Sequence, residues 1–287
     1  MKIPIRLFIS TACMAILASC DRPQAESKPL PVRAAVIGGM STTGLWDFMA
    51  AEFTKRTGIP VEVAAAGPKE VLDEAFRAGG IDLVTMHSSD TATKLAAEGF
   101  SSNLRPWACN ELVIVGPQED PAGIRGLKEG TAALRKIAET KTPFVEARNT
   151  GSQTVSIALW RKLGINPTGD WMLKDESQSR WQVVEFARQR GAYVIVGRIP
   201  VVSGKLASPG MEVLVEGDPM MRRPYVVAEA VASKTGARNP DGARRLADFL
   251  TSTEGQRLLS AHAARRNDGK PVFFPVQPCV PEARNRE

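Results

Sequence analysis

Cysteine and histidine are scarce in this chain of 287 residues, which contains four of the first and two of the second. A structural zinc site needs four thiolate or imidazole ligands at close spacing, and these residues provide no such set. The sequence also lacks spaced histidines for a catalytic metal, a Gly-x-Ser-x-Gly elbow and a phosphate loop ending in Gly-Lys-Ser/Thr. We therefore expect no enzyme activity, no bound metal and no cofactor.

Long apolar runs are absent after the first twenty residues, so no membrane-spanning helix is expected there. Within those twenty, Lys2 and Arg6 precede an apolar run from Leu7 to Leu17 that is too short to cross a bilayer and is typical of a secretion signal. The following Ala18-Ser19-Cys20 resembles the lipobox of bacterial lipoproteins, which implies cleavage before Cys20 and acylation of its thiol. An ordinary signal without a lipid is the alternative. Either signal places the protein outside the cytoplasm.

Two further cysteines, Cys109 and Cys279, remain after removal of the signal. An oxidising compartment would allow them to form one disulfide, and two unpaired buried thiols are the alternative. Asp21 follows Cys20, and in Gram-negative bacteria an Asp at that place resembles a signal for retention at the inner membrane. We therefore expect a protein on the periplasmic side of the inner membrane, attached to the membrane through its lipid only.

Charge of one sign is not concentrated in any segment. The 37 basic and 31 acidic side chains give a formal net charge of +6, which falls by two when Lys2 and Arg6 leave with the signal. Such a dispersed excess favours an anionic ligand weakly and gives little support to nucleic-acid binding. We expect Arg222-Arg223 and Arg265-Arg266 to lie on solvated faces.

Strand and helix patterns alternate along the chain after a proline-rich tether. Short apolar runs predict strands at 32–37, 61–65, 81–86, 111–115, 144–147, 192–196 and 225–231. Apolar residues at helical spacing predict helices at 45–57, 69–77, 90–98, 131–139, 154–163, 178–190, 243–250 and 254–261. This order predicts a doubly wound, parallel α/β sheet in outline, arranged as two lobes that two crossing strands join.

Short motifs between residues 32 and 205 form a specific combination. They are Thr57-Gly58-Ile59, Asp82 to His87, Glu98-Gly99-Phe100, Leu104 to Asn110, Val113 to Pro117, Asp120 to Ile124, Gly164 to Pro167, Gly169-Asp170-Trp171, and Gly191-Ala192-Tyr193 with Arg198. The combination resembles the tungstate-binding proteins of bacterial ABC importers, which are type II periplasmic binding proteins. The resemblance implies a monomeric receptor that closes two lobes over a small oxyanion and delivers it to an ABC permease and its ATPase.

The same resemblance implies a division of the chain into a signal, a tether and two lobes. The signal peptide is expected at 1–19 and the lipid-anchored tether at 20–31. Lobe 1 is expected to combine 32–107 with 228–287, and lobe 2 to comprise 108–227. The fold class is thus α/β, the two-lobe type II periplasmic binding protein fold with two hinge-crossing strands.

The loops expected to hold the ligand depart from the family pattern. Gly38-Gly39-Met40 replaces a Thr/Ser-rich turn, and Gly67-Pro68-Lys69 replaces a Gly-Thr-Gly. In the third loop one alignment puts Arg148 at the family's arginine, whereas an alignment anchored on Trp160 puts Glu146 there. The resemblance therefore predicts the scaffold more firmly than the ligand.

Hydroxyl side chains still gather beside predicted helix starts that follow strand ends, where α/β folds bind ligands. A helix N-terminus offers unpaired N–H groups and the positive end of a dipole, although a hydroxyl there can be a plain N-cap. Two arginines could neutralise a dianion or instead pair with a carboxylate such as Glu146, and His87 matches a family histidine. The expected ligand residues are Ser41, Thr42, Thr43, Ser88, Arg148, Thr150, Ser152 and Arg198.

The identity of the ligand depends on hydrogen-bond acceptors. Phosphate usually carries a proton near neutral pH and needs a carboxylate to accept it, whereas tungstate, molybdate and sulfate need donors only. The loop of related phosphate receptors has an Asp where this chain has Thr150, so we expect tungstate or molybdate ahead of sulfate. A phosphate receptor, a diverged receptor for a non-oxyanion ligand and a sensor accessory remain alternatives.

Overall fold

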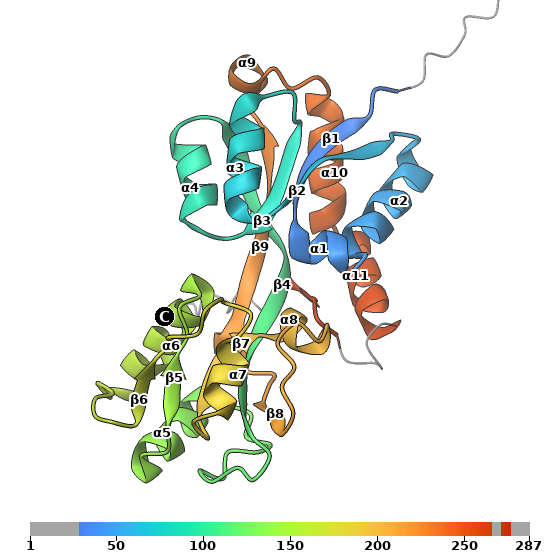
Figure 1. Cartoon of the computed structure of the whole chain (residues 1–287). Helices are drawn as coiled ribbons and strands as arrows, with labels where there is room; N and C mark the ends of the chain where they lie inside the picture. The colour runs from blue at the N-terminus through green and yellow to red at the C-terminus, as the bar shows by residue number, and fades with distance from the viewer. Residues whose placement is uncertain (1–28, 266–270, 277–287) are drawn as a thin grey trace, which may run out of the picture.

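The computed structural model describes residues 29–265 and 271–276, which form two α/β lobes connected by two long strands (Figure 1). The connecting strands are β4 (Ser101–Pro117) and β9 (Arg222–Ala230), which pair antiparallel. The expected two-lobe α/β fold with two crossing strands is therefore confirmed. The predicted signal peptide, Cys20, Cys279 and Arg266 lie outside the described residues.

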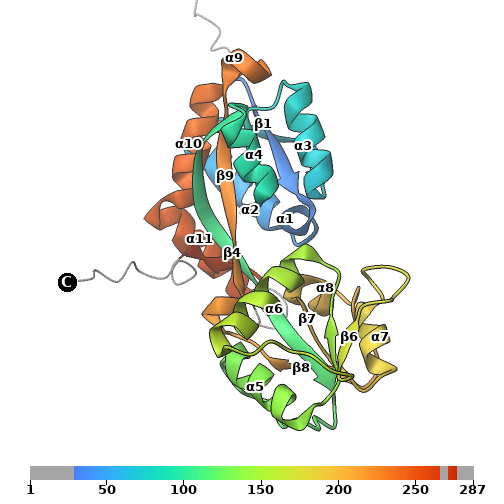
Figure 2. The same cartoon turned by 90° about the vertical axis from the view of Figure 1, so that its left-hand side faces the viewer.

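Lobe 1 contains a mixed sheet in the order β2-β1-β3-β9-β4. Its elements before the crossing are β1 (Val32–Ile37), α1 (Gly38–Thr42), α2 (Leu45–Thr57), β2 (Val61–Gly67), α3 (Lys69–Ala78), β3 (Leu83–His87) and α4 (Asp90–Ala97). Those that follow β9 are α9 (Ala232–Thr235), α10 (Pro240–Thr251), α11 (Thr253–Arg265) and β10 (Phe274–Pro275). The helices α10 and α11 lie along the crossing strands (Figure 2).

Lobe 2 is formed by the chain between the two crossings. Its elements are α5 (Gly130–Thr140), β5 (Phe144–Glu146), α6 (Thr150–Leu163), β6 (Met172–Lys174), α7 (Val183–Arg188), β7 (Tyr193–Gly197), α8 (Arg198–Val202), β8 (Met211–Val215) and the 3-10 helix η1 (Pro219–Met221). The strands follow the order β4-β7-β5-β6, and β8 also pairs with β4.

The prediction of a parallel sheet is correct for part of each lobe and wrong for the crossing strands. β1 runs parallel to β2 and β3, and β5 runs parallel to β6 and β7. β9 is antiparallel to β3 and β4, and β4 is antiparallel to β7. The reason is that one strand enters lobe 2 and the other leaves it, so the two must point in opposite directions.

The buried hydrophobic side chains form one cluster in lobe 1 and two in lobe 2. In lobe 2 the alternation of side chains along β4 separates the clusters: Leu112 and Ile114 face α5 and α6, whereas Val113 and Val115 face α7. A strand with both faces covered needs apolar side chains at every position, which explains the continuous apolar run of this segment.

One predicted helix is shorter than expected, and the difference matters for the site. The pattern predicts a helix at 178–190, but α7 begins at Val183. Before it the chain turns, and the Gln182 N–H donates to the Ser179 carbonyl at 3.0 Å. This turn places Arg180 and Trp181 at the cavity described next.

Candidate functional site

A cavity of about 640 Å³ lies between the two lobes, beside the crossing strands. Lobe 1 contributes the loops that follow β1, β2 and β3, and lobe 2 contributes the loops that follow β5, β6 and β7. Both crossing strands also reach it, β4 with Asn110 and β9 with Arg223 and Tyr225. The cavity is therefore lined by both lobes and by the strands that connect them.

Four helices have their N-cap residue in the lining of this cavity. The N-cap residues of α1, α3 and α8 are Ile37, Pro68 and Gly197, and none makes a side-chain cap hydrogen bond. The fourth helix, α6, is capped by Asn149, whose Oδ1 accepts from the Gly151 N–H at 3.0 Å. Uncapped first-turn N–H groups can donate to an anion, and α3, the one of these three helices that is longer than five residues, also has the positive end of its dipole at the cavity.

Arg223 is the cation that enters the cavity from the crossing strand β9. It is half-buried, and no carboxylate within residues 29–265 and 271–276 forms an ion pair with it. Burial lowers the pKa of Arg223, as expected for a cation withdrawn from water without a counter-ion. The guanidinium lies against the first turn of α6, where a Cβ atom at Gly151 would collide with it. The expectation of a solvated face is therefore wrong for Arg223.

His87 and Tyr225 form an aromatic pair on the lobe 1 side of the cavity, with ring centroids 4.2 Å apart. Burial, helped by the charges of Arg223 and Lys69, lowers the pKa of His87 to about 3. Burial also raises the pKa of Tyr225, which is 1% exposed. Both side chains are therefore neutral at physiological pH and present neutral polar groups beside the arginine.

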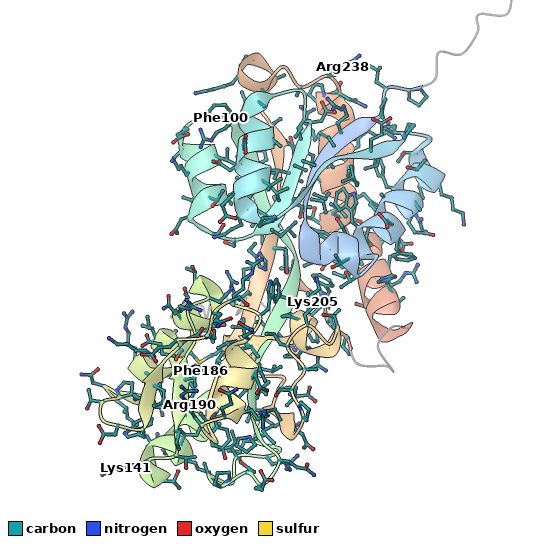
Figure 3. The ribbon with its side chains drawn as sticks, in the orientation of Figure 1. Phe100, Lys141, Phe186, Arg190, Lys205 and Arg238 are labelled. Atoms are coloured by element: carbon teal, nitrogen blue, oxygen red, sulfur yellow. The ribbon has the colours of Figure 1, made fainter. Side chains whose placement is uncertain are left out.

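Two more cations lie at the cavity wall of lobe 2, on the exposed ring of Trp181. The Arg180 guanidinium lies 4.5 Å from the ring centroid and the Lys205 ammonium lies 5.5 Å from it. Figure 3 labels Lys205 near α8, on the side of lobe 2 that faces lobe 1. In the described part of the chain neither cation forms an ion pair, so the cavity wall carries an excess of positive charge.

Asp175 is the one carboxylate among the residues that line the cavity. Its Oδ1 accepts from the Ser177 N–H at 3.0 Å and from the Ser177 hydroxyl at 2.5 Å, and its Oδ2 accepts from the Arg148 N–H at 3.2 Å. Burial alone would raise the pKa of Asp175, but these hydrogen bonds and the charge of Arg148 hold it below its usual range. The carboxylate already has its donors and is poorly placed to accept a proton from a ligand.

The structure brings only some of the predicted ligand residues to this cavity. Thr42, Thr43 and Ser152 line it, as does His87. The hydroxyls of Thr42 and Thr43 donate to the Gly39 carbonyl at 3.4 and 2.8 Å, so they also serve α1 itself. The predicted residues that do not line the cavity are Ser41, Ser88, Arg148, Thr150 and Arg198.

Both predicted arginines pair with carboxylates, which is the alternative that the sequence left open. Arg148 is exposed, lies 3.6 Å from Asp175 and donates to the Ser177 carbonyl. Arg198 is buried and donates to Glu111 at 2.7 Å and to Glu216. Neither arginine pairs with Glu146, the carboxylate considered from the sequence.

Sequence reasoning missed all three cations that line the cavity, Arg180, Lys205 and Arg223. Arg223 lies opposite Asn110 in the β4–β9 register, and it shares a strand face with Tyr225 because the two are two residues apart. Asn110 belongs to a matched family motif, and this was the available signal. The strand register that brings Arg223 to Asn110 cannot be read from the sequence.

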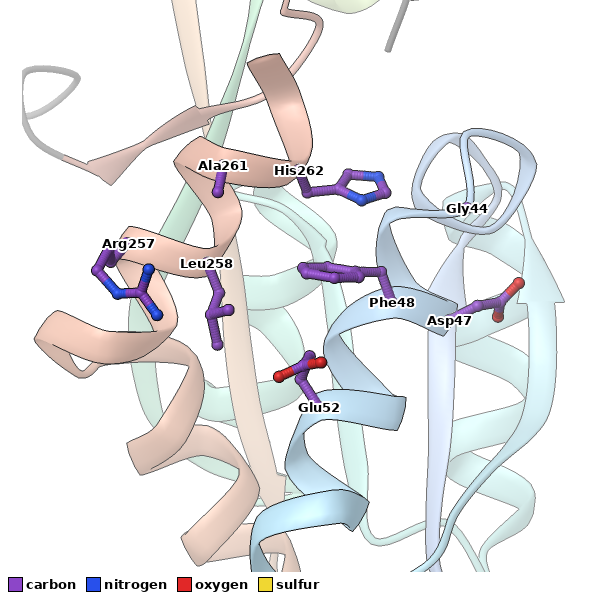
Figure 4. Close-up of a pocket in the computed structure, with 8 residues that line it drawn as sticks. All are labelled: Gly44, Asp47, Phe48, Glu52, Arg257, Leu258, Ala261 and His262. Carbon is purple, nitrogen blue, oxygen red and sulfur yellow. The ribbon is translucent and has the colours of Figure 1, made fainter. Parts of the chain in front are cut away.

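A second hollow of about 710 Å³ lies between α2 and α11 on lobe 1 (Figure 4). The rings of Phe48 and His262 stack there at 4.6 Å, and Asp47, Glu52 and Arg257 complete its polar wall. It contains none of the predicted ligand residues. The interlobe cavity is the better candidate for an anion because its unpaired charges are positive.

Residues 34–263 match the family described as bacterial extracellular solute-binding protein. The chain belongs to this family. The solute-binding protein is 28% identical, over 94% of its length and 97% of the relative's, to the tungstate-binding protein TupA of Peptoclostridium acidaminophilum. Among the helices in the described residues, none is long and apolar enough to span a membrane.

Two solved structures support the same family and fold. The tungstate-binding protein TupA from Desulfovibrio alaskensis is 25% identical, with a TM-score of 0.69 over 86% of this solute-binding protein and 98% of that chain. The tungstate ABC transporter structure from Geobacter sulfurreducens is 26% identical, with a TM-score of 0.62 over 80% and 98%. The resemblance to the tungstate-binding proteins, inferred from short motifs, is thus confirmed.

Proposed function

We propose that this protein is an extracytoplasmic receptor that captures a small tetrahedral oxyanion between its lobes and delivers it to an ABC permease and its ATPase. The observation that carries the proposal is Arg223, a half-buried guanidinium at the interlobe cavity with no carboxylate partner among the described residues. A half-buried cation without a carboxylate partner is stabilised by an anionic ligand, because the ligand supplies the counter-charge that the protein lacks.

Donors from both lobes surround the place where the anion would lie. Lobe 1 supplies the start of α1 and the imidazole of His87, and lobe 2 supplies the start of α8 and the hydroxyl of Ser152. An anion bound between them makes hydrogen bonds to both lobes at once, which favours a closed arrangement and excludes water. The receptor would act as a monomer, since one chain provides the whole site.

Tungstate or molybdate is the proposed ligand, ahead of sulfate. A fully ionised oxyanion needs donors only, and the lining offers donors in excess. Phosphate would need an acceptor, and the one carboxylate of the lining, Asp175, already holds hydrogen bonds from Ser177 and Arg148. The names of the relatives, tungstate-binding proteins, agree with this choice.

Titration calorimetry of refolded, ligand-free protein with tungstate, molybdate, sulfate and phosphate tests the proposal. We expect the first two to bind tightest and phosphate to bind weakest. Phosphate as the tightest ligand, or no binding of any oxyanion, would overturn it.

A second candidate is a receptor for an organic anion, and a specific part of the cavity favours it. Val183, Val196, Leu206 and the exposed ring of Trp181 give the lobe 2 wall an apolar area. Such a wall suits a ligand with an apolar group attached to its anionic group. Small aliphatic and aromatic carboxylates belong in the same calorimetric series, and tighter binding of one of them than of tungstate would favour this candidate.

The location of the receptor is proposed from its first residues. Acylation at Cys20, followed by Asp21, would hold the protein at the inner membrane beside its permease. Metabolic labelling with a fatty-acid analogue should mark the wild type and not Cys20→Ala. Equal labelling of both would contradict the anchor.

Uptake of tungstate by cells that lack the protein tests its role in import. Unimpaired uptake would favour a sensor over an importer.

A further inference from the structure

The C-terminal segment 271–276, which we call the C-terminal clamp, lies against the crossing strands. Its strand β10 pairs antiparallel with β4, with Phe274 opposite Cys109 and Pro275 opposite Ala108. The same two β4 residues also pair with Pro224 and Tyr225 of β9. The clamp is therefore one strand away from the segment that carries Arg223.

Two aromatic side chains of the clamp contact the neighbours of Arg223. The Phe273 ring is 2% exposed and meets the Tyr225 ring edge-on, with centroids 5.4 Å apart. The Phe274 ring receives the Arg222 guanidinium at 4.5 Å from its centroid. The residue before Arg223 and the residue two after it are thus both held by the clamp, and Tyr225 in turn contacts His87.

The clamp is itself fixed to lobe 1 and to β4. The Gln256 side chain of α11 accepts from the Val276 N–H at 2.9 Å and donates to the Trp107 carbonyl at 2.7 Å. Cys109, which faces Phe274 in the strand register, is disulfide-bonded. The Gln256 hydrogen bond to Val276 and the pairing of β10 with β4 hold the clamp in place independently of the contacts that it makes to β9.

We propose that the C-terminal clamp is a positioning element that holds Arg223 in its ligand-ready place by fixing Arg222 and Tyr225. The proposal rests on the anion site proposed above. An arginine without a carboxylate partner has no ion pair to orient it, so its position depends on packing, which the first turn of α6 provides at the guanidinium and the strand neighbours provide at its base. A cation oriented before the ligand arrives loses less conformational freedom on binding, which strengthens binding.

Conservative variants of the clamp separate positioning from general stability. Phe273→Leu and Phe274→Leu remove one aromatic contact each, and Phe274→Tyr restores a ring under Arg222. Phe249→Leu is the matched control, because Phe249 also contacts an aromatic ring and an arginine in lobe 1, Phe53 and Arg56 at 5.8 Å each, but does not line the cavity. All four variants, with the wild type, are compared as full-length mature proteins.

Two measurements are made on each protein. The first is the Nε–H resonance of Arg223 in ¹⁵N NMR spectra of ligand-free protein, assigned with Arg223→Lys. We expect it to shift or broaden in the two clamp leucine variants and to stay unchanged in Phe274→Tyr and Phe249→Leu. The second is the calorimetric affinity for tungstate, which we expect to fall about three- to tenfold in the clamp leucine variants only.

The two measurements separate the two proposals. An unchanged Arg223 resonance in both clamp leucine variants overturns the clamp, whatever the ligand. An equal loss of affinity in Phe249→Leu also overturns it, because the effect would then follow stability alone. A wild type that binds no oxyanion overturns the proposed ligand, while the resonance still decides the clamp.

Discussion

Two arginines are candidates for holding the ligand, Arg148 from the family pattern and Arg223 from the structure. The family pattern favours Arg148, but the structure pairs that side chain with Asp175 and leaves it outside the cavity. Arg223 lines the cavity and has no carboxylate partner in the described chain. The two side chains therefore allow a direct comparison within one protein.

Arg223→Gln should weaken oxyanion binding by about one to two decades, because one charge-assisted hydrogen bond contributes about 1.5–3 kcal/mol. Arg148→Gln, the matched control, should change affinity by less than about threefold, since its partner Asp175 keeps the hydrogen bonds of Ser177. Calorimetry with tungstate measures both. A large loss in Arg148→Gln with little change in Arg223→Gln would return the ligand role to Arg148.

The lowered pKa of His87 predicts how the stability of the protein changes in acid. Its pKa is lowered from its ordinary value to about 3, so the unfolded chain binds a proton between about pH 6.5 and 3 that the folded chain does not. The free energy of unfolding should therefore fall as the pH drops through this range. Urea denaturation of His87→Phe should show a shallower fall than the wild type, and parallel curves would show that His87 does not titrate in this way.

The site residues that the sequence did predict share one property: they follow the ends of strands in their own segment. Thr42, Thr43 and Ser152 lie in such loops, so local order along the chain is enough to find them. Arg223 and Asn110 meet only through the pairing of two strands more than a hundred residues apart. That register depends on tertiary packing, which a single sequence does not display.

At the scale of elements, strong periodicity predicted β1 and α3 almost to the residue. The first half of β4 was missed, because residues 101–110 mix polar side chains with Pro106. Proline is tolerated in a strand at a bulge, and the register of β4 against β9 does shift between Pro106 and Ala108. A strand that leaves one lobe and enters another is exposed to solvent along one part and buried along another. Its apolar and polar side chains therefore follow no single periodicity.

Cys109 of β4 is disulfide-bonded, and the strand β10 pairs with β4 at this residue. Cys279 lies outside the described residues, and its pairing with Cys109 remains a prediction that the position of β10 favours. Thiol titration of denatured, unreduced protein that begins at Asp21 should find no free thiol. Reduction should then cost about 4–5 kcal/mol, the chain-entropy value for closing a loop of more than a hundred residues. Two free thiols would exclude the bridge.

At the scale of the whole molecule, capture of a ligand should bring the lobes together around the cavity. Trp181 reports on this because it lines the cavity and is 43% exposed, whereas Trp46, Trp107 and Trp160 are buried and the half-buried Trp171 does not line the cavity. Saturating ligand should shift the tryptophan emission to shorter wavelength, and Trp181→Phe should abolish the shift. A shift that persists in Trp181→Phe would place the change elsewhere.

The two crossing strands also set the order in which the protein can fold. The buried residues of lobe 2 come from one continuous stretch, 112–221, whereas those of lobe 1 come from 32–108 and from 225–273. A chain that emerges from a membrane translocase N-terminus first can therefore complete lobe 2 while the sheet of lobe 1 still lacks β9. Until β9 pairs with it, β3 has an exposed edge that can pair with a strand of another chain. Edge-to-edge aggregation of the exported protein therefore becomes unfavourable only after the last quarter of the chain has been added to the sheet.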